Sequence, residues 1–144
     1  MSDLDEALFL AVQAHSGQKD RFGSPYILHP LRMMVRMTSD EEKIVAVLHD
    51  AVEKTPLTLD DLRGKKFTED IIDAVDRLTK RENEPYEKHI ERASANPISL
   101  KVKLADLEDN MAQARAHLFS EKEEKRLQRF QKAKDRLEKI LGFG

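Results

Sequence analysis

The sequence predicts an all-α protein, a compact bundle of about seven to eight helices. Between the chain breaks, apolar residues recur every three or four positions, which is the spacing of one helix face and not of a strand. Only five glycines and five prolines interrupt the 144 residues, so few breaks are available. A chain of this length can bury a hydrophobic core, and we expect residues 1–144 to form a single domain.

The first two helical segments lie on either side of a polar loop. Ser2 is placed to cap the first helix, acidic residues follow where the helix dipole favours them, and Gly17 is placed to end it. The polar loop covers residues 18–24, and a proline opens a short apolar segment over residues 26–37. The apolar stripe of the first helix consists of Leu4, Ala7, Leu8, Ala11 and Val12.

Capping residues mark the next three helices. Ser39 and Glu42 form a capping-box pattern ahead of an apolar run, which predicts a third helix over residues 39–55 that ends before a proline. A threonine caps a short helix over residues 59–64. A fifth helix is expected over residues 68–78.

Three further helices complete the predicted bundle. A weaker helix over residues 86–95 ends at Asn96, which is placed to cap the next helix, residues 98–117. Ser120 and Glu123 form another capping-box pattern ahead of the last helix, which is rich in charge and ends at a glycine. The apolar seam of this last helix consists of Leu127, Phe130, Leu137 and Ile140.

Composition excludes several classes of protein. The chain has no cysteine, so it has neither disulfides nor thiolate ligands, and any metal must be held by His, Asp or Glu. Its 25 basic and 27 acidic residues give no global positive field for nucleic-acid binding. It has no apolar run long enough to cross a membrane, and its acidic start is unlike a signal peptide. We therefore expect a cytoplasmic protein without nucleic-acid or membrane partners.

Three short stretches place metal-ligand residues in apolar surroundings. His29 precedes a proline, and His49 and Asp50 follow an apolar run where an unpaired carboxylate would be costly. Glu53 lies one helical turn after His49, on the same face of the expected helix. Each stretch alone is more often structural than functional, so the hypothesis of a metal site rests on the three occurring together.

The third stretch is the apolar helix that contains Asp106, with Asn110 one turn later. Two histidines and two aspartates from three helices would leave coordination positions open, as a hydrolytic metal requires. Mixed imidazole and carboxylate ligands suit Mn, Fe, Co or Zn better than Ca, and the ligand types do not decide among them.

These motifs resemble those of the metal-dependent HD-domain phosphohydrolases, specifically the RelA/SpoT-type (p)ppGpp hydrolase family. The similar stretches are residues 14–30, the His49-Asp50 pair and residues 102–111, and the resemblance spans about residues 4–116. The short length suggests a small single-domain bacterial member. The resemblance implies a compact HD-domain helical bundle.

The resemblance also implies roles for individual residues. One divalent ion, usually Mn²⁺ in the family, would be bound by His29, His49, Asp50 and Asp106. Glu53 would be the catalytic carboxylate that orients or deprotonates the attacking water. The substrate would be a nucleoside polyphosphate, and the reaction resembles that of a guanosine-3′,5′-bis(diphosphate) 3′-pyrophosphohydrolase. Positions near the nucleotide are matched by Lys103 and Asn110.

The chain departs from the family pattern at two positions. Lys54 follows Glu53 where the family usually has an aspartate, so Lys54 joins Glu53 and Asp50 as a candidate catalytic residue. Asp20 stands where the family usually has a basic residue, and Arg21 is the candidate to replace it as a substrate contact. The alternative function is therefore a nucleotide-binding or sensory HD module with weak or no turnover. A metal-free helical scaffold is a third interpretation, and the oligomeric state is unknown.

A charged segment near Tyr86 has two interpretations. Lys80 and Arg81, with Lys88 and Arg92, would form an anion-binding rim beside a stacking Tyr86, or they would form only a solvated helix face. Of the other histidines, His15 is expected to pack in the core or at the rim of the site. We expect His89 and His117 at the surface.

Overall fold

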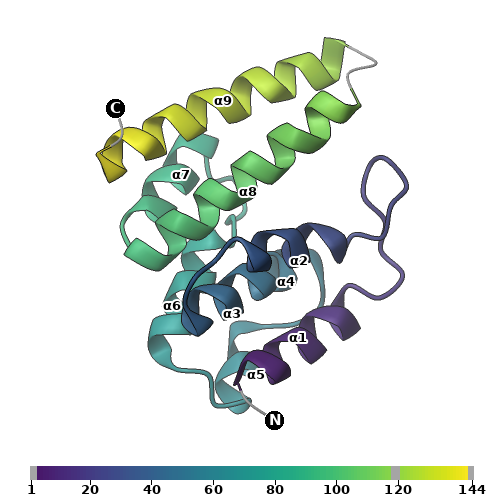
Figure 1. Cartoon of the computed structure of the whole chain (residues 1–144). Helices are drawn as coiled ribbons and strands as arrows, with labels where there is room; N and C mark the ends of the chain where they lie inside the picture. Colours follow the sequence, from purple (N-terminus) through teal and green to yellow (C-terminus); the bar gives the residue numbers. More distant parts are fainter. Residues whose placement is uncertain (1–2, 118–120, 143–144) are drawn as a thin grey trace.

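The computed structural model describes residues 3–117 and 121–142, and over these residues the protein is all-α (Figure 1). Their helices are α1 (Asp3–Ala14), α2 (Leu28–Val35), α3 (Asp40–Leu48), α4 (Ala51–Lys54), α5 (Leu59–Gly64), α6 (Glu69–Leu78), α7 (Tyr86–Ser94), α8 (Pro97–Ala116) and α9 (Glu121–Leu141). α8 and α9 run side by side along one side of the molecule, and α1 and α5 lie on the opposite side (Figure 1). The predicted fold class is confirmed.

The expected third helix is in fact two helices, α3 and α4. The chain turns at His49 and Asp50, where the N–H of His49 bonds to the carbonyl of Ala46, three residues back, and not to a carbonyl four residues back. This break divides one of the eight expected segments into two. It also means that Glu53 is not on the same helix as His49, contrary to our prediction.

The predicted capping signals occur where the described residues include them. The Ser39 side chain accepts from the N–H of Glu42, and Glu42 bonds back to Ser39 N, which completes the capping box of α3. Asn96 accepts from two N–H groups at the start of α8. The predicted caps at Ser2 and Ser120 lie outside the described residues.

Two groups of buried apolar side chains form the core, and α8 contributes to both. The larger group joins α1, α2, α3, α5 and α6, and α8 adds Val102 and Ala105 to it. The smaller group lies between α7, α8 and α9 and includes Leu107 and Met111 of α8. Because α8 contributes to both groups, several of its polar side chains are buried, among them Lys103, Asp106 and Asp109.

Two residues that were expected on buried apolar faces are exposed in the structure. Val12 of α1 is 51% exposed, whereas Leu10, which lies outside the expected stripe, is buried, because α1 meets the core with a slightly rotated face. Ile140 near the end of α9 is 51% exposed, because α9 faces the smaller group with Leu137 and Leu141 instead. Within the described residues, no helix combines the length and apolarity needed to cross a bilayer.

The capping box of α3 leads to a stability prediction. The Glu42 carboxylate accepts from Thr38 Oγ1 at 3.0 Å and from Lys101 Nζ at 3.1 Å, besides Ser39 N. Burial alone would raise the pKa of Glu42, but Lys101 and these donors outweigh it and lower the pKa from 4.5 to about 2. Glu42→Ala should lower the free energy of unfolding by about 1–2 kcal/mol in urea titrations.

The pH dependence of this loss follows from the lowered pKa of Glu42. A carboxylate whose pKa is depressed by folding stabilises the fold above its unfolded pKa and loses that effect as the pH falls through its folded pKa. The difference between wild type and Glu42→Ala should be full above about pH 4.5 and shrink toward about pH 2. Asp40→Ala, at an exposed position in the same first turn, is the control. An equal loss in both variants would contradict this role of Glu42.

Candidate metal centre

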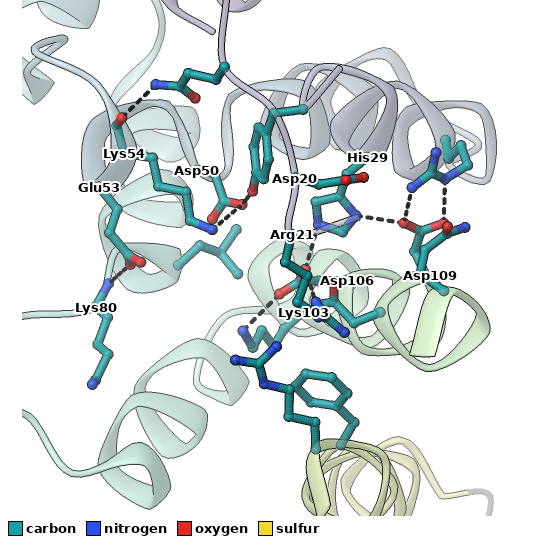
Figure 2. Close-up of a pocket in the computed structure, with 18 of the residues that line it drawn as sticks. Asp20, Arg21, His29, Asp50, Glu53, Lys54, Lys80, Lys103, Asp106 and Asp109 are labelled. Atoms are coloured by element: carbon teal, nitrogen blue, oxygen red, sulfur yellow. Dashed lines mark hydrogen bonds and ion pairs between the residues drawn. The ribbon is translucent and has the colours of Figure 1, made fainter. Parts of the chain in front are cut away.

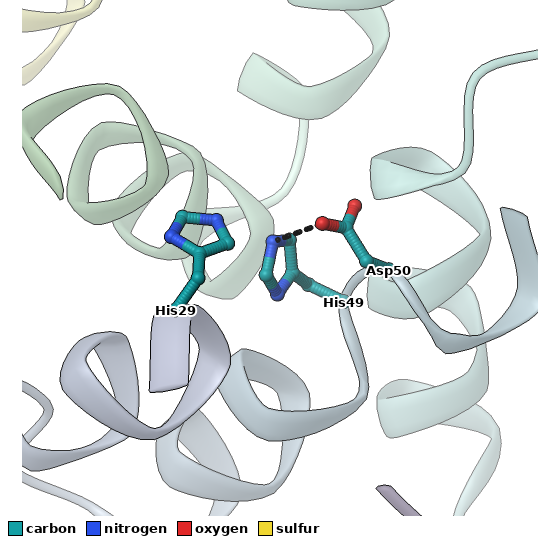
Figure 3. A group of neighbouring side chains, drawn as sticks. All are labelled: His29, His49 and Asp50. Carbon is teal, nitrogen blue, oxygen red and sulfur yellow. Dashed lines mark ion pairs between the residues drawn. The ribbon is translucent and has the colours of Figure 1, made fainter. Parts of the chain in front are cut away.

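Three predicted ligands meet at the junction of three helices. His29 lies at the start of α2, His49 follows the last residue of α3, and Asp50 precedes the first residue of α4 (Figure 3). One ligand atom from each residue lies within 4.8 Å of the others. The turn between α3 and α4 therefore places two consecutive side chains in one cluster with His29.

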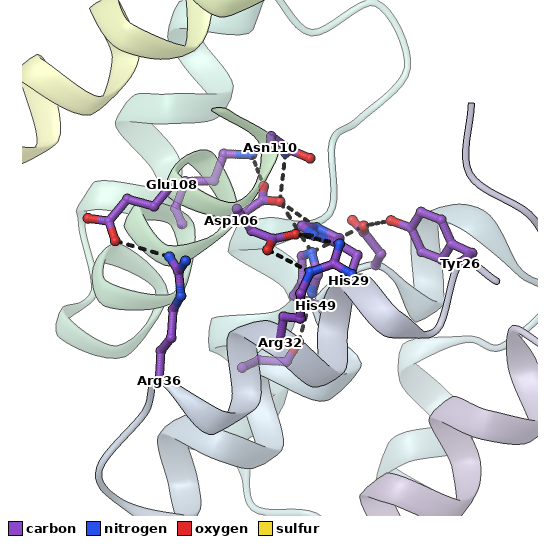
Figure 4. A network of polar contacts seen from close by, with 12 residues as sticks. Tyr26, His29, Arg32, Arg36, His49, Asp106, Glu108 and Asn110 are labelled. Carbon is purple, nitrogen blue, oxygen red and sulfur yellow. Dashed lines mark hydrogen bonds and ion pairs between the residues drawn. The ribbon is translucent and has the colours of Figure 1, made fainter. Parts of the chain in front are cut away.

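Asp106 joins the same cluster from α8. Its Oδ1 lies 2.8 Å from His29 Nε2 and 3.6 Å from His49 Nε2. The side chains of Lys103 and Asn110 hold Asp106. Lys103 Nζ lies 2.8 Å from Oδ2 (Figure 2), and Asn110 Nδ2 lies 3.0 Å from Oδ1 (Figure 4). The structure thus brings all four sequence-predicted ligands together, and it places Lys103 and Asn110 against one of them.

The electrostatics of the cluster favour a bound cation. Burial alone would lower the pKa of His49, but the charges of Asp50 and Asp106 outweigh it and raise the pKa to about 10. For Asp106, burial would raise the pKa, yet Lys103 and the two histidines hold it well below its ordinary value. Two buried carboxylates therefore attract positive charge, which ring protons or a metal ion can supply.

The orientation of His49 fits a metal ligand. Its Nδ1 donates to the carbonyl of Ala46 at 2.7 Å, so Nε2 is the nitrogen that faces the cluster. Nε2 is buried and forms no hydrogen bond with any described residue, although Asp50 Oδ2 is 3.1 Å away. A buried ring nitrogen aimed between carboxylates fits His/Asp coordination of a divalent ion.

Tyr26 and Lys54 flank Asp50 on its cavity side. The Tyr26 hydroxyl donates to Asp50 Oδ2, and burial together with the charge of Asp50 raises the pKa of Tyr26, so the hydroxyl keeps its proton. Lys54 Nζ lies 3.8 Å from the same oxygen and 4.8 Å from the centre of the Tyr26 ring. The position at which the chain departs from the family pattern is thus a cation beside a candidate metal ligand.

Glu53 lines the same cavity as the cluster, although it is not on the helix we predicted. Its Oε1 accepts from the backbone N–H of Lys80 at 2.6 Å (Figure 2). This bond from the segment after α6 fixes one carboxylate oxygen and orients the side chain. Glu53 is exposed to solvent within the cavity.

The cavity beside the cluster has a volume of about 700 Å³ and a cationic wall. Eight cationic and five acidic side chains line it. The cationic ones are Lys19, Arg21, Arg32, Lys54, Lys80, Lys103, Arg126 and Arg129. Tyr86 also lines it, with its hydroxyl buried and without a hydrogen-bond partner among the described residues, and the guanidinium of Arg129 lies 5.2 Å from the centre of its ring. The size and charge of this cavity suit an anionic small molecule.

Not every predicted substrate contact is placed for that role. Arg21 lines the cavity, but its guanidinium forms a two-point ion pair with Glu123, at 3.0 and 2.8 Å. Arg81 does not line the cavity, because it faces Asp76 of α6 at 3.5 Å. Of the expected rim, Lys80 and Tyr86 line the cavity, whereas Arg81 does not.

The other two cations of the expected rim also lie outside the cavity lining. Arg92 is used in the fold, where it bonds to Glu84 and to the carbonyl groups of Asp76 and Thr79. Lys88 is exposed and pairs with Glu91 on the same helix. Arg92 therefore joins α7 to the end of α6 and to the segment after it.

Two of the remaining histidines are more buried than expected. His89 was expected at the surface but is 3% exposed, because its face of α7 packs toward the cavity, and burial lowers its pKa to about 4. His117 is half-buried and stacks on Phe22, with ring centres 3.9 Å apart. His15 is buried, as expected, and its Nδ1 contacts Gln18 Oε1 at 2.8 Å.

The sequence reasoning missed functional candidates on α2 and α8. Asp109 is buried and contacts His29, and Arg32 pairs with Asp109. Burial alone would raise the pKa of Asp109, but the hydrogen bonds from His29 and Arg32 outweigh burial and lower this pKa to about 2. The signal was present, because Asp109 is another aspartate in an apolar helix, three residues after Asp106. No comparable sequence signal marks Arg126 and Arg129, which α9 brings to the cavity by tertiary packing.

An all-α bundle that collects two histidines and two aspartates from its helices at the edge of a polar cavity has the features of an HD domain. No protein-family model matches the sequence. A solved structure of a metazoan ortholog of SpoT that hydrolyzes ppGpp shares this fold, with a TM-score of 0.71 at 20% identity. The match covers 100% of this chain and 98% of that one.

Curated relatives identify the type of HD domain. A guanosine-3′,5′-bis(diphosphate) 3′-pyrophosphohydrolase of Aquifex aeolicus is 31% identical over 121 residues, 76% of this chain. A GTP pyrophosphokinase of Streptomyces coelicolor is 33% identical over 139 residues, 88% of this chain. The bifunctional (p)ppGpp synthase/hydrolase SpoT of Escherichia coli is 37% identical over 84 residues, 54% of this chain. The chain is an HD-domain protein of the RelA/SpoT type, and it spans 17%, 16% and 12% of the lengths of these relatives.

Proposed function

We propose that the protein is a metal-dependent nucleotide phosphohydrolase that releases pyrophosphate from the 3′ position of guanosine-3′,5′-bis(diphosphate) or a similar nucleotide. The observation that carries this proposal is the cluster of His29, His49, Asp50 and Asp106 at the edge of a cationic cavity. The named activities of the Aquifex aeolicus and Escherichia coli relatives support the substrate class.

The metal would be held by these two histidines and two aspartates. The donor set suits Mn²⁺, Fe, Co or Zn, and the resemblance to the RelA/SpoT-type family favours Mn²⁺ among them. A divalent ion bound there would polarise a phosphoryl oxygen and lower the pKa of water. Lys103 and Asn110 keep Asp106 turned toward the histidines, and Tyr26 does the same for Asp50.

Glu53 is the proposed general base. Since the Lys80 N–H holds Oε1, the second oxygen, Oε2, is the one that takes the proton from the attacking water. The water oxygen then bonds to phosphorus, the bond between phosphorus and the ribose 3′ oxygen breaks, and that oxygen takes up a proton. The products are the guanosine nucleotide with a free 3′-hydroxyl and pyrophosphate.

The cavity wall supports a polyanionic substrate. Lys54 and Lys80 lie on the side of Glu53, whereas α9 provides Arg126 and Arg129. Two groups of cations on different elements suit a ligand that carries phosphate groups at separate positions. The buried hydroxyl of Tyr86 is available to hydrogen-bond such a ligand.

The experiment is a pyrophosphate-release assay on the full chain with a panel of nucleoside polyphosphates. With Mn²⁺, we expect release from guanosine-3′,5′-bis(diphosphate) or a close analogue, and we expect EDTA to abolish it. Turnover of no member of the panel would contradict a hydrolase.

The alternative is a binding or sensory module, and the position of Lys54 beside Asp50 favours it, because this cation replaces a carboxylate expected from the family. Under that alternative, calorimetry would detect nucleotide binding without hydrolysis, and turnover would appear in Lys54→Asp.

A further inference from the structure

Asp109 holds the His29 ring from the side opposite the metal cluster. Its Oδ2 accepts from His29 Nδ1 at 2.6 Å, while His29 Nε2 faces Asp106 Oδ1 at 2.8 Å (Figures 2 and 4). Asp109 is nearly inaccessible to solvent, with a side chain that is 2% exposed. Both ring nitrogens of His29 are therefore engaged, each by a different aspartate of α8.

Arg32 fixes Asp109 in turn. Its Nε donates to Asp109 Oδ1 at 2.8 Å and its Nη2 to Oδ2 at 2.9 Å, a two-point pairing that defines both the position and the plane of the carboxylate. His29 and Arg32 are three residues apart on α2, as Asp106 and Asp109 are on α8. One turn of α2 thus supplies His29 and Arg32, and one turn of α8 supplies the two aspartates that they contact.

We propose that Asp109, held by Arg32, is a positioning residue that keeps His29 Nδ1 protonated and Nε2 directed at the metal centre. A neutral imidazole can carry its proton on either nitrogen, and only the unprotonated one can bind a metal. A carboxylate that accepts from Nδ1 selects the required tautomer and prevents the ring from turning. This inference rests on the proposed metal centre and not on any substrate.

The neighbouring ion pair provides a matched control. Arg36, which directly follows α2 and lies four residues after Arg32, pairs with Glu108 of α8, which directly precedes Asp109. Arg36 Nη1 lies 3.2 Å from Glu108 Oε2 (Figure 4). The Arg36 and Glu108 side chains are 40% and 38% exposed. Glu108→Gln therefore removes the carboxylate of this second ion pair and leaves the contact between Asp109 and His29 in place.

The experiment measures Mn²⁺ binding by calorimetry to the metal-free full chain of wild type, Asp109→Asn and Glu108→Gln. We expect a single strong site in wild type, an affinity about 10–100-fold lower in Asp109→Asn, and less than about a threefold change in Glu108→Gln, consistent with a surface ion pair. Arg32→Gln should weaken Mn²⁺ binding less than Asp109→Asn does. Because Arg32 is partly exposed, we expect Arg32→Gln to fold, so its Mn²⁺ affinity still tests the proposal if Asp109→Asn does not fold.

A spectroscopic readout separates positioning from general destabilisation. In ¹⁵N-labelled Zn²⁺-loaded protein, the His29 Nδ1 proton should give a downfield, slowly exchanging signal that Asp109→Asn shifts or removes and Glu108→Gln preserves. Equal Mn²⁺ affinity in wild type and Asp109→Asn, with this signal unchanged, would overturn the role of Asp109 alone. Absence of Mn²⁺ binding in wild type would overturn both this inference and the proposed metal centre.

Discussion

His49→Ala is expected to abolish stoichiometric metal binding and, with it, nucleotide hydrolysis. His49 Nε2 lies in the centre of the cluster, 3.1 Å from Asp50 Oδ2 and 3.6 Å from Asp106 Oδ1, and forms no hydrogen bond with any described residue. Its removal also leaves Asp50 and Asp106 without the imidazole that lies between them. The affinity for Mn²⁺, measured by calorimetry, should fall by more than about 100-fold, beyond the loss typical of residues that only orient a ligand.

Controls distinguish this effect from unfolding. His49 is fully buried, so circular dichroism must show that the variant keeps its helices, and Asp106→Asn offers a ligand variant of nearly unchanged volume. His117→Ala removes a histidine that lies outside the cluster and should retain both metal and activity. Metal binding at wild-type strength in folded His49→Ala would show that the cluster is not the metal site.

Glu53→Gln should lower kcat by about 10²–10⁴-fold, the usual contribution of a positioned general base, while leaving Mn²⁺ affinity within about threefold of wild type. The glutamine keeps an oxygen that can accept from Lys80 N, but it cannot take a proton. Steady-state hydrolysis with Mn²⁺ gives kcat and KM, and calorimetry gives the affinity for the metal.

The matched control for this variant is Glu82→Gln. Glu82 is exposed in the same segment as Lys80, so its substitution removes one negative charge near the cavity without affecting the carboxylate at Glu53. Its kcat should stay close to that of wild type. A kcat for Glu53→Gln similar to that of Glu82→Gln would assign the proton transfer to another group.

The fold class and the residues of the His/Asp cluster were predictable because their signals are local. Helical spacing and capping residues mark the helices, and an aspartate in an apolar helix, as at Asp106, indicates a buried charge that requires a partner. The break at His49 and Asp50 has no comparable signal, since neither glycine nor proline marks it. The expectation that Glu53 shares a helix with His49 was therefore wrong, although tertiary packing returns Glu53 to the same cavity.

The partners of charged side chains were the least predictable part of the site. Arginines often contact phosphate groups, and Arg21 and Arg92 were candidates for that role, but the structure pairs Arg21 with Glu123 and Arg92 with Glu84. Such pairings join residues far apart in the sequence, and spacing along one helix does not reveal them. The same reason explains why Arg32 and its bonds to Asp109 became visible only in the structure.

Metal content is the most direct test of the account. Elemental analysis of the full chain, purified without chelator and loaded with Mn²⁺, should find about one divalent ion per chain in wild type. His49→Ala should contain none, as expected if the cluster of two histidines and two aspartates is the site. Absence of a stoichiometric ion in wild type, or an unchanged content in folded His49→Ala, would contradict the proposed metal centre.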